Sequence, residues 1–309
     1  MKKVYYFTLI FLFAFGGKTI AQSSLDFVPA GGAFPIIALP PSETTTNTDY
    51  LSLSNYHFFN PYYYNPAMAG IEGKKQINAN WNRQFYNSYS LSYEQPVSSI
   101  NSAFGMHFSY TSNYSSAVRY FGLAYNYGFQ LDQAQLKLGL QFSQISVALN
   151  ESLFGFSDDK KEWYNTPSMD AGLAFQYKQI RIGASVKNLF PSKFITADNI
   201  TRFINVTNGE RQFNISFANT IKLSKQWDWS LAVLLRNAES QDIHDFSSYI
   251  SFRKNYFVGA TFRTQVEHHW VGFVGVKIKE KVNLQFSFNA QKEDSEDRRF
   301  IETLAQFQF

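Results

Sequence analysis

The stretch Val282-Asn-Leu-Gln-Phe-Ser-Phe-Asn-Ala290 alternates apolar and polar residues at every position. Successive side chains of a β-strand point to opposite faces, so this period of two predicts a strand with one apolar and one polar face. The same alternation recurs within 76–82, 104–110, 213–218 and 229–236. The polar faces are rich in Asn, Gln and Ser, whereas the apolar faces carry Phe, Leu and Val.

We expect about fourteen such strands, near residues 75–84, 87–95, 102–111, 118–129, 134–146, 168–177, 180–189, 211–223, 227–237, 243–253, 256–264, 269–278, 281–291 and 300–309. In the second half of the chain, tight links at 178–179, 224–226, 253–255 and 279–281 alternate with longer polar links at 147–167, 190–210, 238–242 and 292–299. Outer-membrane barrels alternate short periplasmic turns and longer external loops in this way. The sequence therefore predicts an all-β fold, a single transmembrane antiparallel β-barrel over residues 75–309. An even number of strands would keep both of its ends on the periplasmic side.

The composition fits a barrel in the bacterial outer membrane. The 309 residues carry a net charge of +4, only 17% charged residues, and 18% aromatics, among them 32 Phe and 19 Tyr. A barrel of this size is often one domain, and its aromatic surface suits outer-membrane lipid. The absence of Cys excludes disulfides and thiolate metal sites. No basic stripe is visible, so nucleic acid is not an expected partner.

The N-terminus has the pattern of a secretory signal peptide over residues 1–21. Lys2 and Lys3 precede an apolar core at 4–15, and small residues precede the expected cleavage between Ala21 and Gln22. The alternative is a membrane anchor, but the core is shorter than the ~18 residues that a spanning helix needs. Because no other segment approaches that length, an exported chain would enter a membrane only as a barrel.

The stretch His57-Phe-Phe-Asn-Pro-Tyr-Tyr-Tyr-Asn-Pro-Ala-Met-Ala-Gly70 interrupts the strand pattern. Asn-Pro steps favour turns, and Pro cannot donate to a strand ladder. We therefore expect an irregular, aromatic lead-in to the first strand, within an irregular N-terminal segment at 22–74. Its residues 22–56, rich in Pro, Gly and Thr, also lack any period.

The chain ends in Ile301-Glu-Thr-Leu-Ala-Gln-Phe-Gln-Phe309. Ile301, Ala305, Phe307 and Phe309 fall on one face of the expected last strand. A terminal aromatic on the outward face is similar to the signal that barrel-assembly machinery recognises, so we predict that role for Phe307 and Phe309. The alternative is a soluble β-sandwich or lipocalin-like barrel, which would need far fewer strands.

Signals for catalysis or metal binding are weak. His268 and His269 would point to opposite faces of a strand, so they are poorly placed to ligate one metal ion. His107 and Ser109 share a face and leave open an outer-membrane lipid hydrolase, although Ser is abundant on every polar face. The charge runs at 158–162 and 292–299 fit solvated loop tips; the functional alternative is contact with a secreted partner or weak cation binding. We predict no catalytic residue, metal or cofactor and expect no enzyme activity.

The segment Phe58-Phe-Asn-Pro-Tyr-Tyr-Tyr-Asn-Pro-Ala-Met-Ala-Gly70 resembles the N-terminal signature of the PorP/SprF family, outer-membrane proteins associated with type IX secretion. In that family, Phe-Asn-Pro-x-x-Tyr-Asn-Pro-Ala-x-Ala-Gly precedes the first strand. Trp81-Asn-Arg-Gln-Phe85 resembles the strand ending that follows, and 167–177 leading into 182–189 resembles a later strand pair. The resemblance covers roughly 58–309. Residues 49–56 match the family only loosely, and a Pro/Gly/Thr-rich stretch precedes them.

The resemblance implies a non-enzymatic protein that assists the export or cell-surface attachment of cargo such as gliding adhesins. Its implied partners are a secreted adhesin or its sorting domain and other type IX secretion components. The alternative is an outer-membrane channel or hydrophobic-solute transporter, which would need an open lumen instead of one closed by residues 22–70 or by inward side chains.

The candidate site is the lead-in itself. We expect that Asn60, Pro61, Asn65 and Pro66 set its path, that Tyr62, Tyr63 and Tyr64 supply contacts to a partner, and that Gly70 closes it. A purely structural plug that fixes the first strand is the alternative.

Overall fold

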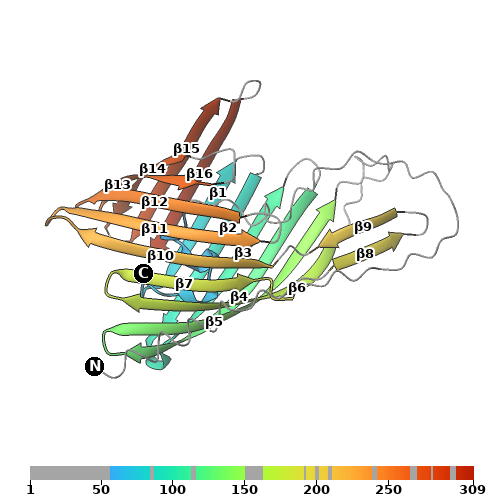
Figure 1. Cartoon of the computed structure of the whole chain (residues 1–309), viewed down its shortest axis with the longest axis horizontal. Coiled ribbons are helices and arrows are strands. Elements are labelled where there is room, and N and C mark those ends of the chain that lie inside the picture. Colours follow the sequence, from blue (N-terminus) through green and yellow to red (C-terminus); the bar gives the residue numbers. More distant parts are fainter. Residues whose placement is uncertain are drawn as a thin grey trace. The chain divides into compact units, whose positions relative to one another are not determined.

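The computed structural model describes residues 56–83, 87–112, 116–149, 163–190, 193–198, 202–207, 211–238, 242–264, 270–279, 281–292 and 297–309. Fourteen antiparallel strands form a closed barrel, and a separate two-stranded sheet lies between β7 and β10 in the sequence (Figure 1). The predicted fold class and number of barrel strands are thus confirmed. The predicted signal peptide at 1–21 and residues 22–55 of the predicted irregular segment lie outside the described residues.

The barrel strands are β1 (Gln76–Arg83), β2 (Asn87–Val97), β3 (Ser102–Ser112), β4 (Ser116–Leu131), β5 (Ala134–Leu149), β6 (Trp163–Tyr177), β7 (Ile180–Lys187), β10 (Gln212–Lys222), β11 (Trp227–Ala238), β12 (Asp242–Phe252), β13 (Tyr256–Arg263), β14 (Trp270–Ile278), β15 (Val282–Lys292) and β16 (Asp297–Gln308). Each strand pairs with its neighbour in this order, and β1 closes the barrel on β16, with Gln76 opposite Gln308 and Arg83 opposite Ile301. Closure gives every barrel strand a partner on each side, which is the condition for crossing a bilayer with strands, although a strand that extends beyond a shorter neighbour has one partner there.

Strands replace parts of four predicted loops, one of which, 238–242, contains the end of β11 and the start of β12. Within the expected loop 190–210, β8 (Lys193–Asp198) and β9 (Arg202–Thr207) pair with each other. They are rich in Ile, Val, Thr and Phe, which favour strands, but each is only six residues long. The strands β5, β15 and β16 also extend into the expected loops 147–167 and 292–299.

The start of β6 at Trp163, five residues before the predicted start at 168, has a topological reason. Pro lacks the N–H that a ladder needs, so Pro167 would disfavour a strand that is paired on both sides. In the barrel, β7 pairs with β6 only from Ala171 onward, whereas β5 pairs along all of it to Trp163. Pro167 therefore lies on a strand edge, where a missing N–H is tolerated.

The alternation of side chains places polar residues inside and apolar residues outside. Phe108 is 44% exposed, for example, whereas the neighbouring His107 is buried in the lumen. Outward aromatic residues near one end of the barrel are Tyr127, Phe129, Tyr177, Trp227, Tyr256 and Phe309; those toward the other end are Trp81, Tyr89, Tyr110, Phe213, Trp270 and Phe288. Such girdles are typical of outer-membrane barrels. Phe307 and Phe309 both face outward, as expected, and their recognition by assembly machinery stays a prediction.

The two ends of the barrel differ in the length of their connections. At the end where β1 starts and β16 finishes, strands are joined by short turns at 98–101, 132–133, 178–179, 223–226, 253–255 and 279–281. We call this the turn end, and we call the opposite end, which includes the connections at 150–162 and 188–211, the link end. Short turns of outer-membrane barrels lie on the periplasmic side. Among the described residues, no helix combines the length and apolar character needed to cross a membrane.

Candidate functional site: the segment inside the barrel

Residues 57–71, which we call the plug segment, lie inside the barrel and contain most of η2 (Tyr56–Phe58), all of η3 (Pro61–Tyr63) and all of η4 (Pro66–Met68). The 3-10 helices η3 and η4 start at the two prolines because Pro has a helix-like φ and needs no partner for an N–H at the first position. Asn65 caps η4, since its Oδ1 accepts from the Ala67 N–H at 2.9 Å. Asn60 instead donates through Nδ2 to Ser92 Oγ at 3.1 Å. The first Asn-Pro step thus joins the wall of the barrel, and the second shapes the segment.

The three tyrosines of the plug segment are buried. Tyr62, Tyr63 and Tyr64 are only 2, 6 and 4% exposed. They contact the inner wall of the barrel instead of forming an exposed periplasmic surface. Their placement favours the plug alternative over the expected partner contact.

Tyr62 and Tyr63 pack against the first half of the barrel. The Tyr62 ring lies against Ala124 and approaches Gly105, whose missing side chain leaves room for it. The Tyr63 ring lies 4.7 Å from the His107 ring between centroids, and Lys187 Nζ lies 5.1 Å from the Tyr63 centroid. Contacts with β3, β4 and β7 therefore hold this part of the segment.

Tyr64 fixes the segment to the second half of the barrel. Its backbone oxygen accepts from Ser185 Oγ at 2.7 Å and from Asn214 Nδ2 at 3.2 Å. Its ring packs against Leu234, and the Arg236 guanidinium lies 5.7 Å from the ring centroid. Wall side chains on β7 and β10 thus satisfy a carbonyl that would otherwise be buried without a donor.

Asn65 makes three side-chain hydrogen bonds. Besides capping η4, its Nδ2 donates to the backbone oxygens of Leu173 at 2.8 Å and Ala184 at 3.2 Å. Gly139 and Gly172 make this approach possible: a Cβ at Gly172 would collide with Asn65 Oδ1, and one at Gly139 with the Ala67 nitrogen. The wall is therefore hollowed at the point where the second Asn-Pro step passes.

The segment leaves the lumen toward β1 through polar contacts. Asn126 Nδ2 donates to the Ala69 oxygen at 2.8 Å, and the Gly70 N–H donates to Glu94 Oε2 at 2.7 Å. Gly70 has a φ of 62°, a left-handed conformation that glycine adopts without strain. Glu94 also accepts from Gln76 Nε2 at 2.5 Å, so one carboxylate joins the end of the plug segment to the first residue of β1.

The start of the segment packs on the opposite wall. The Phe58 ring lies 4.7 Å from the Tyr249 ring and the Phe59 ring 5.1 Å from the Phe257 ring, measured between centroids. Gln306 Nε2 donates to the Phe59 oxygen at 2.9 Å. With the preceding contacts, the plug segment reaches residues on β2 to β7, β10 to β13 and β16, and it therefore crosses the lumen.

A buried charge cluster lies beside the start of the segment. Asp245 accepts from Arg236 at 2.7 Å and from Arg263 Nε at 2.5 Å, with all three side chains at most 5% exposed. His57, in η2 and outside the spanning strands, is 3.4 Å from Ser247 Oγ through Nε2. Burial lowers the pKa of His57 to about 4, the Asp245 carboxylate opposes the shift, and both guanidinium groups add to it. His57 is therefore neutral at pH 7.

Of the weaker candidates for catalysis, metal binding or partner contact, some lie in the lumen and others lie outside the described residues. His107 and Ser109 both face the lumen, as their shared face predicted, and the His107 ring packs against Tyr63 and also lies 5.3 Å from the Tyr120 ring. The pair is part of the packing around the plug segment. His268 and His269, the run at 158–162 and residues 293–296 lie outside the described residues.

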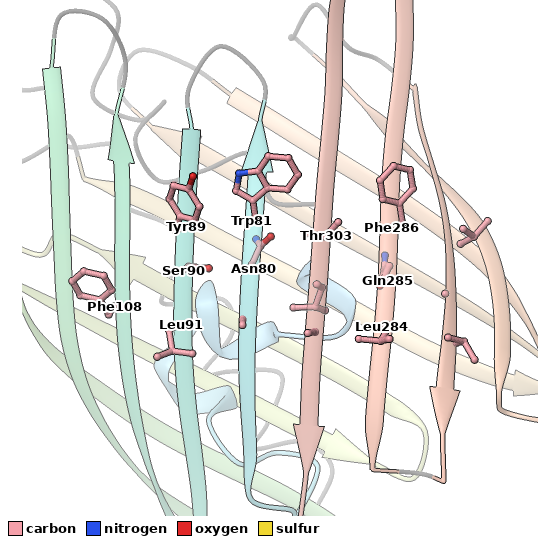
Figure 2. Close-up of a pocket in the computed structure, with 16 residues that line it drawn as sticks. Asn80, Trp81, Tyr89, Ser90, Leu91, Phe108, Leu284, Gln285, Phe286 and Thr303 are labelled. Atoms are coloured by element: carbon pink, nitrogen blue, oxygen red, sulfur yellow. The ribbon is translucent and has the colours of Figure 1, made fainter.

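On the lipid side, the wall over β1 and β16 forms a hollow of about 980 Å³. Its lining includes the small residues Ala79 and Ala305. Larger residues, among them Trp81, Leu91 and Phe286, also line it (Figure 2). Figure 2 also shows the short helices of the plug segment behind these strands. The hollow faces the hydrocarbon of a membrane, and acyl chains fit its apolar lining.

Residues 46–299 match the family described as type IX secretion system membrane protein PorP/SprF. The chain belongs to this family. The resemblance of the Asn-Pro segment and the strands that follow it is thereby confirmed, and so is the predicted location of this PorP/SprF protein in the bacterial outer membrane. No curated protein matches the chain.

Solved outer-membrane barrels are similar to this PorP/SprF chain only at a distance. The outer membrane protein Omp33 of Acinetobacter baumannii is 10% identical, with 76% of this chain and 98% of that chain covered and a TM-score of 0.47. The toluene transporter TbuX of Ralstonia pickettii is 11% identical, with 79% and 92% covered and a TM-score of 0.48. The toluene transporter TodX of Pseudomonas putida is 10% identical, with 80% and 92% covered and a TM-score of 0.47.

Proposed function

We propose that this PorP/SprF barrel is a closed, non-enzymatic component of type IX secretion that assists the export or surface attachment of cargo such as gliding adhesins. One observation carries the proposal: the plug segment crosses the lumen from β2 to β12. A diffusion channel needs an open polar interior, and the inner wall of this barrel binds its own chain instead. The barrel would then act through the surfaces at its two ends.

The contacts of the plug segment support a fixed element. Wall side chains donate to the backbone oxygens of Phe59, Tyr64 and Ala69. Each such hydrogen bond contributes roughly 0.5–1.5 kcal/mol to holding the segment in place. An interior that matches one chain in this way favours anchoring over transport of solutes.

The proposed function is tested by deleting the gene in the producing bacterium and measuring secreted adhesins on intact cells by surface labelling. We expect the loss of one or more adhesins from the surface, restored by the wild-type gene. Normal display of every adhesin would contradict the proposal.

A triple Tyr62→Ser, Tyr63→Ser, Tyr64→Ser variant separates the two roles of the motif. Barrel assembly is measured first, as heat-modifiable mobility on gels. If the tyrosines are only a plug, an assembled variant restores display; if they bind a partner, the assembled variant does not. Because all three are buried, we expect display to be restored.

A further inference from the structure

The turns at one end of the barrel are strongly cationic. They contain six basic residues, Lys178, Lys225, Arg253, Lys254, Lys279 and Lys281, against two acidic ones, Asp132 and Glu280. The connections at the link end have the opposite balance in sequence. They contain five basic residues, Lys160, Lys161, Lys193, Arg202 and Arg211. They contain eleven acidic residues, Glu151, Asp158, Asp159, Glu162, Asp198, Glu210, Glu239, Glu267, Glu293, Asp294 and Glu296. A macromolecule that approaches the turn end therefore meets net positive charge.

The backbone conformation of these turns does not explain why basic residues occupy several of their positions. Lys178, Arg253, Lys254 and Lys279 have φ values of 53°, 50°, 59° and 49°. This left-handed conformation is unfavourable for a residue with a side chain, and Gly or Asn would relieve it in a tight hairpin turn. Asn101 and Asp132 in the turns of the same end also have positive φ, so four of the six such residues described there are basic.

A pocket of about 210 Å³ opens among the turn-end residues, next to the plug segment. Phe59 and Phe257 form an aromatic side of it, with their rings 5.1 Å apart. Lys254 and Lys277 also line it. The acidic residues that line it are Glu72, which is paired with Arg181, and Asp228. The pocket thus combines cationic groups with an aromatic surface.

Two buried acceptors in this pocket have no donor. Asn283 Oδ1 and Gln308 Oε1 belong to side chains that are 5 and 9% exposed, and neither atom has a hydrogen-bond partner among the residues that the structure describes. A buried acceptor without a donor is unfavourable, so a ligand with N–H groups would be favoured here. Peptide backbone supplies such donors, whereas lipid phosphate or a free carboxylate does not.

We propose that this pocket, at the cationic end of the barrel, binds an acidic peptide segment of a periplasmic protein. Carboxylates would pair with Lys254 and Lys277, backbone N–H groups with Asn283 and Gln308, and an apolar side chain would contact Phe257. The proposal rests on the proposed function only in that a secretion component would supply the peptide. Anionic lipid is a poorer fit, because Lys277 lies on the inward face of β14, with Val271 and Phe273.

The binding test uses the purified full-length barrel in detergent and a fluorescein-labelled peptide that is rich in Glu and contains one Phe. Fluorescence anisotropy should show saturable binding that weakens with salt and is lost when Gln replaces every Glu. The double variant Lys254→Gln, Lys277→Gln should weaken binding by about tenfold or more, since it removes two ion pairs worth about 1.4 kcal/mol together.

The matched control is the double variant Lys178→Gln, Arg253→Gln. It removes the same charge from the same end, but Lys178 lies over the outward Tyr177 ring and Arg253 over the Phe252 ring. We expect it to change binding less than twofold. Equal losses in both double variants, or no binding to the wild type, would overturn the proposal.

Vesicles of phosphatidylglycerol test the lipid alternative. Vesicle binding that is lost in the Lys254→Gln, Lys277→Gln variant while the peptide fails to bind would also overturn the proposal. Normal adhesin display in the gene deletion would instead contradict the proposed function without affecting the peptide result, so the two failures are distinguishable.

Discussion

Replacement of Asn65 by Ala should release the plug segment. The change removes the cap of η4, worth about 1 kcal/mol, and two hydrogen bonds to Leu173 and Ala184, worth about 1 kcal/mol each. Together these losses amount to about 3 kcal/mol, which raises the population of an undocked segment by roughly 150-fold. Asn65→Ser retains a capping oxygen, so it should lose about 2 kcal/mol and give an increase of roughly 30-fold.

The absence of Cys makes the assay direct. Ala69 is fully buried in the plug segment, so an Ala69→Cys substitution in an otherwise unchanged barrel supplies a single buried thiol. The rate at which this thiol reacts with a membrane-impermeant maleimide is measured. When opening and closing are fast, the rate follows the population of the open form. The control is Asn219→Ala on β10, which faces outward and away from the plug segment, and which should leave the rate unchanged.

Heat-modifiable mobility shows that each variant is still a barrel. If Asn65→Ala barrels were intact and reacted within twofold of the parent rate, the reasoning that Asn65 anchors the plug segment would be refuted.

Three further predictions rest on the same geometry. Gly139→Val should displace the plug segment and speed the maleimide reaction of the thiol introduced by Ala69→Cys, whereas Gly272→Val, whose Cβ would meet nothing nearer than 3.4 Å, should not. Asp245→Asn leaves two buried guanidinium groups without their carboxylate and should lower the free energy of unfolding in detergent by about 3–5 kcal/mol, whereas Asp242→Asn, at a more exposed position, should change it by less than about 0.5 kcal/mol. Phe309→Ser should reduce the fraction of chains assembled in the outer membrane, measured as heat-modifiable protein per cell; unchanged assembly would remove its predicted role as a signal.

The barrel could be predicted from the sequence because each strand has one face toward lipid and the other toward a polar lumen. Val282 to Ala290 shows this period at every position, and the same contrast sets the faces of the other strands. The prediction of strand positions failed where neighbouring strands, and not the local sequence pattern, determine the structure, or where a strand is very short. Pro167 would disfavour a strand that is paired on both sides, yet it is tolerated where β6 has only one neighbour. The strands β8 and β9 were missed because a strand of six residues is too short for its alternation of polar and apolar residues to be recognised.

The sequence indicated which residues form the candidate site, but it did not indicate that they lie deep in the lumen. The two Asn-Pro steps indicated an irregular segment before β1, and it is irregular. Its depth in the lumen depends on the inward glycines Gly139 and Gly172, whose meaning appears only when the wall is assembled. The charge cluster was missed for the same reason, because Arg236, Asp245 and Arg263 meet only through the register of β11, β12 and β13.

The most direct test of the central claim is the conductance of the purified full-length barrel in planar bilayers. A lumen crossed by residues 57–71 predicts no stable open level in the wild type, and discrete open levels in the Asn65→Ala variant as the segment undocks. Sustained ohmic steps from the wild-type barrel, unchanged by Asn65→Ala, would contradict a closed lumen and would favour the channel alternative.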